Sequence, residues 1–293
     1  MDTYKLSPYE YIPGSLLCAE SLPSTEHISK EQVCKFFKDE VYLKIEFSLL
    51  ESLYRFPYLT KKNMERYTNA KLKDRQHAGY DHFIRQLMTD GCLRRFSYNG
   101  TRLYCLSDGA RAYFQDKLDP KNLHRIHIPS EENPVAVLEC AALAQWHLSV
   151  MQGGDIRRSR FHEQVTIRRQ DVFLPSFLEV QKNNIRYRVL SLSIPKESIH
   201  MEPFIDQILQ IKTFLSRWGF SLQMEIFLIV LVCESTHEMS KMAQILEKLQ
   251  TTKALSFYFV CESNTIFSKG LDLLYTAKRK DGEMVLETIS VKG

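Results

Sequence analysis

The first half of the chain alternates apolar and polar residues with the period of short amphipathic helices. In residues 43–56, apolar side chains recur every three or four positions, which is the spacing of one helix face, and Pro57 ends the stretch. Thr60 is placed to cap a second, short helix. A third helix is expected at residues 74–89, with Gly91 just beyond its end, where a glycine commonly stops a helix.

A hairpin and a further helix follow. Two apolar-rich runs flank Asn99-Gly100, a pair that is a strong sequence signal for a tight β-hairpin. Ser107 then begins the helix SDGARAYFQDKL, with Ala110 and Phe114 on one side. The run LYCLSDGARAYF resembles the end of the wing and the following helix of bacterial winged-helix regulators. This resemblance implies an α+β winged helix-turn-helix, and some winged helices mediate only protein contacts.

The second half of the chain changes to longer apolar runs and predicts an α/β domain with a mixed sheet. The expected elements, in chain order, are a helix at 134–152, strands at 163–169, 171–180 and 185–194 with a turn at Asn183-Asn184, a helix at 201–217, a strand at 224–233, a helix at 237–250 and a strand at 255–261. The last two strands are continuously apolar, which suits a sheet buried on both faces. The helix between them permits a parallel crossover.

These patterns divide the chain of 293 residues, which is long enough for two cores. The expected divisions are an irregular N-terminal tail at 1–29, a winged-helix domain at 30–118, a linker at 119–134 and the α/β domain at 135–293. The tail contains three prolines, and we expect it to lie over a domain surface or to be partly mobile.

The positive charge is concentrated in the predicted winged helix. Residues 1–29 hold one Lys and four acids, a net of −3, whereas residues 30–118 hold seventeen Lys and Arg against eleven acids, a net of +6. The remaining residues carry a net of +1. Local basicity of this kind is typical of a module that binds a polyanion, although a basic face can also be solvated charge without a partner.

Eight side chains are candidates for contact with duplex DNA. Phosphates require Lys or Arg, and base edges are contacted by Gln, Arg or His. The third helix and the wing present such residues away from the apolar stripe: Arg75, Gln76, His77, His82, Arg85, Arg94, Arg95 and Arg102.

The order of elements in the second half resembles that of restriction-endonuclease-like, or PD-(D/E)XK, folds. Together with an N-terminal winged helix, it resembles the replication-relaxation family of plasmid, phage and conjugative-element proteins. In that family a basic-Pro-Asp turn precedes a carboxylate-bearing strand and a long helix. The segment Arg168-Arg169-Gln170-Asp171 matches the turn with Gln170 in place of proline, whereas Ser191 and Ser193 stand where the family has acids. The resemblance therefore implies a degenerate nuclease domain.

Hydrolysis of a phosphodiester at a metal requires at least two carboxylates and an assisting lysine. Asp171 supplies one carboxylate, and Glu179 shares its strand parity but lies eight residues further along, about 26 Å in an unbent strand. Lys182 and Lys196 are the candidate lysines. We interpret these four residues as vestigial and expect neither a metal nor a cofactor.

Both late apolar strands end in Val-Cys-Glu-Ser, at residues 232–235 and 260–263. One interpretation is a repeated active-site signature at the carboxyl ends of parallel strands. The favoured one is that Ser235 and Ser263 cap helices and that the cysteines pack in the core, since neither segment has a base or a metal cluster close to it in the sequence.

The leading hypothesis is a DNA-binding accessory or regulatory protein of a bacterial mobile element, acting in plasmid replication or transfer. Its partners would be double-stranded DNA and a protein that contacts the C-terminal domain. The alternatives are a metal-dependent nuclease and an interaction module that does not bind DNA. Seven scattered cysteines without CxxC spacing favour reduced thiols. With no secretion signal and no membrane-spanning run, a cytoplasmic location is expected.

Overall fold

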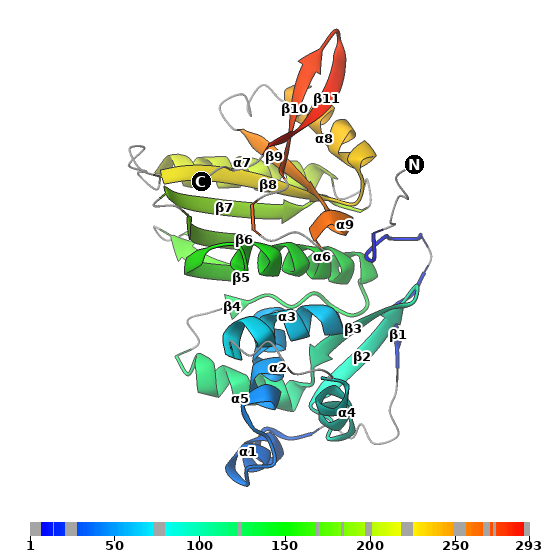
Figure 1. Ribbon diagram of the computed structural model, residues 1–293, viewed down its shortest axis with the longest axis vertical. Coiled ribbons are helices and arrows are strands. Elements are labelled where there is room, and N and C mark those ends of the chain that lie inside the picture. The colour runs from blue at the N-terminus through cyan, green and yellow to red at the C-terminus, as the bar shows by residue number, and fades with distance from the viewer. Residues whose placement is uncertain are drawn as a thin grey trace. The chain divides into compact units, whose positions relative to one another are not determined.

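The computed structural model describes residues 7–13, 15–20, 28–72, 80–121, 125–167, 170–182, 185–196, 201–217, 225–248, 256–265, 270–271 and 274–289. Over these residues the protein is mixed α/β, with nine helices and two sheets (Figure 1). The chain forms two compact units: unit 1 is Met1–Tyr11, Gln145–Phe161 and Leu174–Gly293, and unit 2 is Ile12–Ala144 and His162–Phe173. Each of these units includes residues from both sides of the domain boundary expected between residues 134 and 135. The expected domain boundaries stay a prediction.

Five helices lie wholly within the described residues of unit 2: α1 (Lys30–Lys38), α2 (Lys44–Arg55), α3 (Lys61–Leu72), α4 (Asp81–Thr89) and α5 (Asp108–Leu118). Its antiparallel sheet has the order β1 (Cys18–Ala19), β2 (Leu93–Tyr98) and β3 (Thr101–Leu106). The helices expected at 43–56, after Thr60 and after Ser107 are confirmed. The second continues to Leu72, and α1 was not predicted. A capping box between Ser29 and Gln32 begins α1.

The third predicted helix is present in its C-terminal part. It is described from Asp81, whereas residues 73–79 lie outside the described residues. Gly91 has a φ of 74°, which fits its predicted place just beyond the helix. The predicted hairpin is confirmed: Asn99 and Gly100 have φ values of 46° and 78°, and β2 and β3 pair on either side of them.

The core of unit 2 joins α2 to the hairpin. Leu49, Leu50 and Leu53 of α2 are completely buried. Leu59, between α2 and α3, forms an isolated antiparallel bridge with Tyr104 of β3. The backbone hydrogen bonds of this bridge, 2.8 and 3.1 Å long, tie the chain after α2 to the hairpin.

The larger sheet has the order β11-β10-β9-β8-β7-β6-β5-β4. Its strands are β4 (Arg125–Ile126), β5 (Asp155–Ile167), β6 (Gln170–Lys182), β7 (Ile185–Ser193), β8 (Glu225–Cys233), β9 (Phe257–Cys261), β10 (Leu274–Lys280) and β11 (Glu283–Ile289). Its helices are α6 (Pro134–Met151), α7 (Met201–Arg217), α8 (Thr236–Lys248) and α9 (Glu262–Thr265). β4 and the adjoining ends of β5 and β6 belong to unit 2.

The predicted parallel crossover is confirmed. β8 pairs in parallel with β7 on one side and β9 on the other, while β6 and β7 pair antiparallel. Val230, Leu231 and Val232 are completely buried, so β8 is covered on both faces, as its continuous apolar sequence indicates. The predicted turn at Asn183-Asn184 lies outside the described residues. β5 begins at Asp155, earlier than expected, and the β10–β11 hairpin was not predicted.

Helix α6 is a core helix. Among the described residues it is the one helix long and apolar enough to span a membrane by composition, yet 78% of it is buried inside the protein. Within unit 1, Trp146 Nε1 donates to Ser191 Oγ at 2.8 Å, and His147 bonds Ser176 and Ser159 at 2.8 Å each. Burial lowers the pKa of His147 to about 3, so this histidine is neutral at physiological pH.

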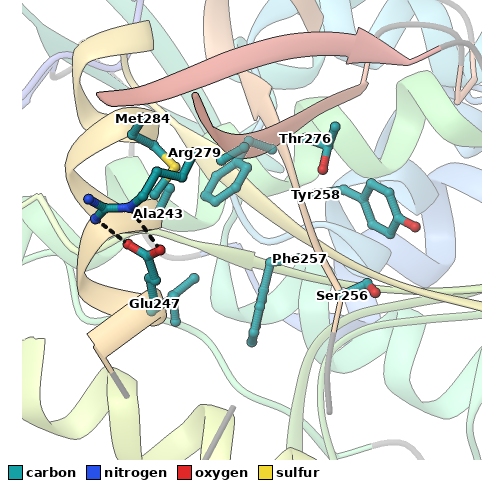
Figure 2. Close-up of a pocket in the computed structure, with 11 residues that line it drawn as sticks. Ala243, Glu247, Ser256, Phe257, Tyr258, Thr276, Arg279 and Met284 are labelled. Atoms are coloured by element: carbon teal, nitrogen blue, oxygen red, sulfur yellow. Dashed lines mark hydrogen bonds and ion pairs between the residues drawn. The ribbon is translucent and has the colours of Figure 1, made fainter. Parts of the chain in front are cut away.

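Unit 1 also has a pocket of about 400 Å³ beside the C-terminal hairpin (Figure 2). α8, β9, β10 and β11 line it, with Phe257 and Met284 among its apolar residues. Glu247 of α8 and Arg279 of β10 meet at its margin through two hydrogen bonds of 2.7 and 3.1 Å. The ion pair joins the hairpin to α8 and limits the pocket on that side.

Candidate nucleic-acid interface

Helix α4 presents one face to solvent and one to the core of unit 2. Ile84, Leu87 and Met88 are buried, and they follow the spacing of the predicted apolar stripe. On the other side, His82 and Arg85 are exposed and Gln86 is half-buried. The other candidates of the predicted third helix, residues 75–77, lie outside the described residues.

The N-terminus of α4 is joined to α3 by an ion pair. Lys61 Nζ lies 2.6 Å from Asp81 Oδ1, and this contact raises the pKa of Lys61 and lowers that of Asp81. The contact thus favours the charged form of both groups. Lys61 begins α3 and Asp81 begins α4, so the pair fixes the starts of the two helices against each other.

The three arginines of the hairpin do not share one face. Successive side chains of a strand point to opposite faces, so Arg94 and Arg95 diverge. Arg95 lies on the face of Ser97, and Ser97 pairs with Arg102 across the hairpin. Arg95 and Arg102 are therefore neighbours on one face, whereas Arg94 is on the other. Arg94 and Arg95 therefore lie on opposite faces of the hairpin, and contact of either with DNA stays a prediction.

Arg94 is held against the protein itself. Its guanidinium lies 5.8 Å from the ring centroid of Phe96 and its Nη2 lies 2.6 Å from Glu131 Oε1. The other two arginines share one acid: Arg95 pairs with Glu20, and Arg102 Nε lies 3.6 Å from the same carboxylate. Arg102 is the most exposed of the three, at 62% of its side chain.

The four residues that were interpreted as vestigial, Asp171, Glu179, Lys182 and Lys196, have different surroundings. Asp171 is exposed and accepts a hydrogen bond of 2.6 Å from Thr166. Glu179 is buried in unit 1, 3.4 Å from Arg188 and 3.9 Å from Arg158. Both acids belong to strand β6, eight residues apart along it. Lys182 ends that strand, beside Ile185 of β7.

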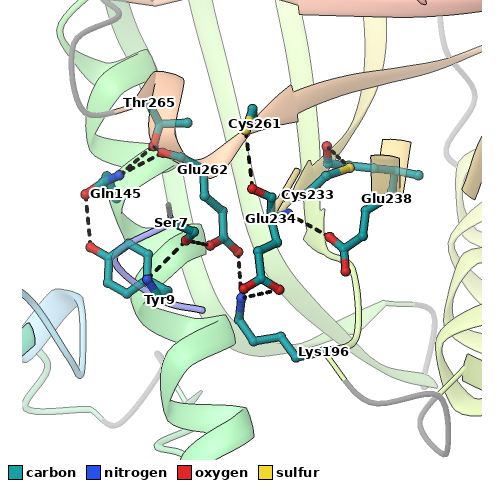
Figure 3. A network of polar contacts seen from close by, with 11 residues as sticks. Ser7, Tyr9, Gln145, Lys196, Cys233, Glu234, Glu238, Cys261, Glu262 and Thr265 are labelled. Atoms are coloured by element: carbon teal, nitrogen blue, oxygen red, sulfur yellow. Dashed lines mark hydrogen bonds and ion pairs between the residues drawn. The ribbon is translucent and has the colours of Figure 1, made fainter. Parts of the chain in front are cut away.

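Lys196 lies in a buried polar cluster that sequence reasoning did not find (Figure 3). Its Nζ is 2.9 Å from Glu262 Oε1 and 3.8 Å from Glu234 Oε2. Glu234 and Glu262 directly follow β8 and β9, and Lys196 lies three residues after β7, so the carboxyl ends of three parallel strands bring the three side chains together. Ser7 donates a hydrogen bond to Glu262, and Tyr9, which is completely buried, donates one of 2.9 Å to Gln145.

The charges in this cluster depend on one another. Burial alone would lower the pKa of Lys196, but Glu262 and Glu234 outweigh it and the pKa is raised. Burial raises the pKa of Glu234 to about 7, against the opposing effect of Lys196. Lys196 is therefore a cation at neutral pH, and Glu234 is a carboxyl group that gains and loses its proton near neutrality.

The sequence signal for this cluster was the repeated Val-Cys-Glu-Ser. Val232 pairs with Val260 and Cys233 with Cys261, so the repeats are in register and their glutamates are neighbours. Ser235 does cap α8, accepting from Glu238 N at 3.2 Å, and both cysteines are buried. Ser263 lies inside α9 and bonds Cys261 at 3.2 Å, so its predicted role as a cap is wrong.

Within the described ranges, no group of three or more His, Cys, Asp and Glu side chains is arranged to hold a metal ion. In the cluster around Lys196, the two acids Glu234 and Glu262 pair with the lysine cation, so these charges form internal ion pairs.

No family model matches the chain, and neither do any of the curated proteins or solved structures with which it was compared.

Proposed function

We propose that the chain binds double-stranded DNA through α4 and the β2–β3 hairpin, which act as the recognition helix and the wing of a winged helix. The succession α2, bridge at Leu59, α3, α4 and hairpin supports this assignment. The net charge of +6 over residues 30–118 supports a polyanionic ligand.

The observation that carries the proposal is the exposed face of α4. His82 and Arg85 point away from the buried stripe and are exposed. Arg85 offers a planar fork of donors for a phosphate or for a guanine edge, and His82 adds a donor one turn earlier. Arg102 on the hairpin supplies a further exposed cation.

We propose in addition that the α/β part of unit 1 is a noncatalytic scaffold. Glu179 is held by arginines, and Ser191 stands opposite Ser176 and accepts a hydrogen bond from Trp146. The contacts of Glu179 support a structural use of this acid, and those of Ser191 support a structural use of one of the two serines that stand where the family it resembles has acids. A Mg²⁺-dependent plasmid-nicking assay tests this, and cleavage that is lost in Asp171→Ala would contradict it.

The biological setting that we propose comes from the family resemblance: a plasmid, phage or conjugative element of a bacterium. In that setting the protein would be an accessory or regulatory factor in replication or transfer, with a protein partner on unit 1.

Fluorescence anisotropy on random and element-derived duplexes across a salt series tests DNA binding. We expect Arg85→Ala to weaken binding and to reduce sequence preference, and Arg102→Ala to weaken binding to all duplexes similarly. Each lost phosphate contact should lower the salt slope by about one. Lys117→Ala, which removes one exposed charge from α5, is the matched control.

A protein-interaction module is the second candidate. It is favoured by the pairing of Arg94, Arg95 and Arg102 with Glu131 and Glu20, since these contacts neutralise the wing internally. Absence of duplex affinity for the wild-type protein at low salt would put this candidate first.

A further inference from the structure

The N-terminal segment adds a strand to the edge of the basic hairpin. Cys18 pairs with Ser97 and Ala19 with Phe96, and Glu20 N donates to Arg95 O at 2.9 Å. The added strand β1 has two residues, so few backbone hydrogen bonds hold it. Such a short edge strand is among the easier elements of a sheet to displace.

Glu20 contacts both strands of the hairpin with its carboxylate. It pairs with Arg95 of β2 and, at 3.6 Å, with Arg102 of β3. These two arginines share the face that strand alternation defines, so a single acid covers the pair. The side chain of Glu20 is 26% exposed and that of Arg95 is 24% exposed, which leaves this ion pair at the protein surface.

The contact leaves donor capacity unused. Arg95 Nε is buried and has no hydrogen-bond partner among the described residues. A guanidinium has five N–H donors in a fixed fork, and one carboxylate shared between two guanidinium groups cannot satisfy them all. A phosphate diester on each arginine would supply more acceptors than Glu20 does. Glu20, which belongs to a segment with a net charge of −3 over residues 1–29, thus occupies the place that a phosphate would take.

We propose that Glu20 and the β1 strand form an intramolecular mask that competes with a nucleic-acid backbone for Arg95 and Arg102. This inference rests on the proposed function for the identity of the ligand. The segment lowers affinity in the resting protein and is displaced, at least at its carboxylate, when the wing binds phosphate. The mask is weak because ion pairs at the surface contribute little, so it tunes binding and does not abolish it.

The test compares Glu20→Gln with Asp116→Asn. Both changes remove one negative charge from unit 2. Asp116 pairs with Lys30, whereas Glu20 pairs with the hairpin arginines Arg95 and Arg102. In Glu20→Gln we expect roughly a two- to tenfold gain in duplex affinity and a salt slope that is steeper by about one to two. Asp116→Asn should change affinity less than about twofold.

A second background separates unmasking from a general change of charge. In protein that carries Arg95→Ala and Arg102→Ala, Glu20→Gln should give no gain, because the cations that it would release are gone. Thermal melts followed by circular dichroism confirm that each variant is folded. A gain in Glu20→Gln that equals that of Asp116→Asn, or one that persists without the two arginines, overturns the inference.

Retention on a heparin column distinguishes failure of the proposed DNA binding from failure of the proposed mask. If no variant binds duplex DNA, the proposed function fails, and elution from heparin then decides the masking claim alone. Later elution of Glu20→Gln than of Asp116→Asn supports the mask for polyanions in general. Equal elution of the two variants overturns it.

Discussion

Lys196 Nζ lies 2.9 Å from Glu262 Oε1, and both side chains are 1% exposed. The pair lies at the carboxyl ends of β7 and β9, and Glu234, which follows β8, lies 3.8 Å from Lys196 Nζ. Ser7 also bonds Glu262, so the pair fastens the N-terminal segment to the sheet of unit 1. Its role here is structural, and its removal has a measurable cost.

Replacement of Lys196 by Met should destabilise the protein by about 3–5 kcal/mol, because it leaves buried carboxylates without their cation. Urea unfolding followed by circular dichroism measures the change. Lys278→Met is the matched control, since Lys278 pairs with Glu287 at an exposed site, with 60% of its side chain accessible, and should change stability little. Equal losses in the two variants would show that the buried pair contributes nothing special.

Glu234 makes stability depend on pH near neutrality. Its pKa is raised from 4.5 to about 7 in the folded protein, so between these values the folded state binds more protons than the unfolded state. The free energy of unfolding therefore falls as the pH rises through this window, by something of the order of 3 kcal/mol for this group. Glu234→Gln should remove that part of the slope in urea titrations at pH 5, 6 and 7. Parallel profiles for the two proteins would contradict the assignment.

Two isoleucines of β8 provide a test of its burial. Ile229 is 2% exposed and Ile226 is 42% exposed. An aspartate at Ile229 would place an unpaired carboxylate in the covered part of the sheet, at a cost of several kcal/mol, and we expect Ile229→Asp to abolish cooperative folding. Ile226→Asp should stay folded. Soluble, cooperatively melting Ile229→Asp would show that this part of β8 tolerates a charge.

The hairpin arginines should differ in their effect on stability. Arg94 stacks over Phe96 and pairs with Glu131, so Arg94→Ala should lower the free energy of unfolding by roughly 1 kcal/mol. Arg102→Ala, at a side chain that is 62% exposed, should stay within about 0.5 kcal/mol of the wild type. Chemical denaturation measures the free energy of unfolding of both variants. Indistinguishable unfolding curves would show that the two arginines contribute equally to stability, against this prediction.

Elements with local causes could be predicted from the sequence. Asn99-Gly100 determines its turn through two residues that adopt positive φ, and β8 is recognisable from its own apolar run. The same kind of signal was overlooked at Asp281-Gly282, where φ values of 50° and 86° form the turn of the last hairpin. The signal was present, but the flanking strands are polar and mixed, so their alternation was weak.

The candidate sites were harder to predict because their partners are distant in the sequence. Glu20 meets Arg102, and Lys196 meets Glu262, across separations that no periodicity encodes. The two identical tetrapeptides are neighbours because β8 and β9 pair in parallel and in register. That pairing would have to be known before their proximity could be predicted. The choice of strand neighbours is a property of the whole sheet, and one sequence does not specify it.

Strand β11 ends the larger sheet, and its charges affect how copies of the protein meet. A strand at a sheet edge is a template for further strands, and charged side chains blunt it. Antiparallel pairing of two copies of β11 around Val285 would set Glu283 of each against Glu287 of the other, and like charges directly opposite are unfavourable. In this register the glutamates of β11 disfavour the addition of a second copy at the strand where growth of the sheet would begin.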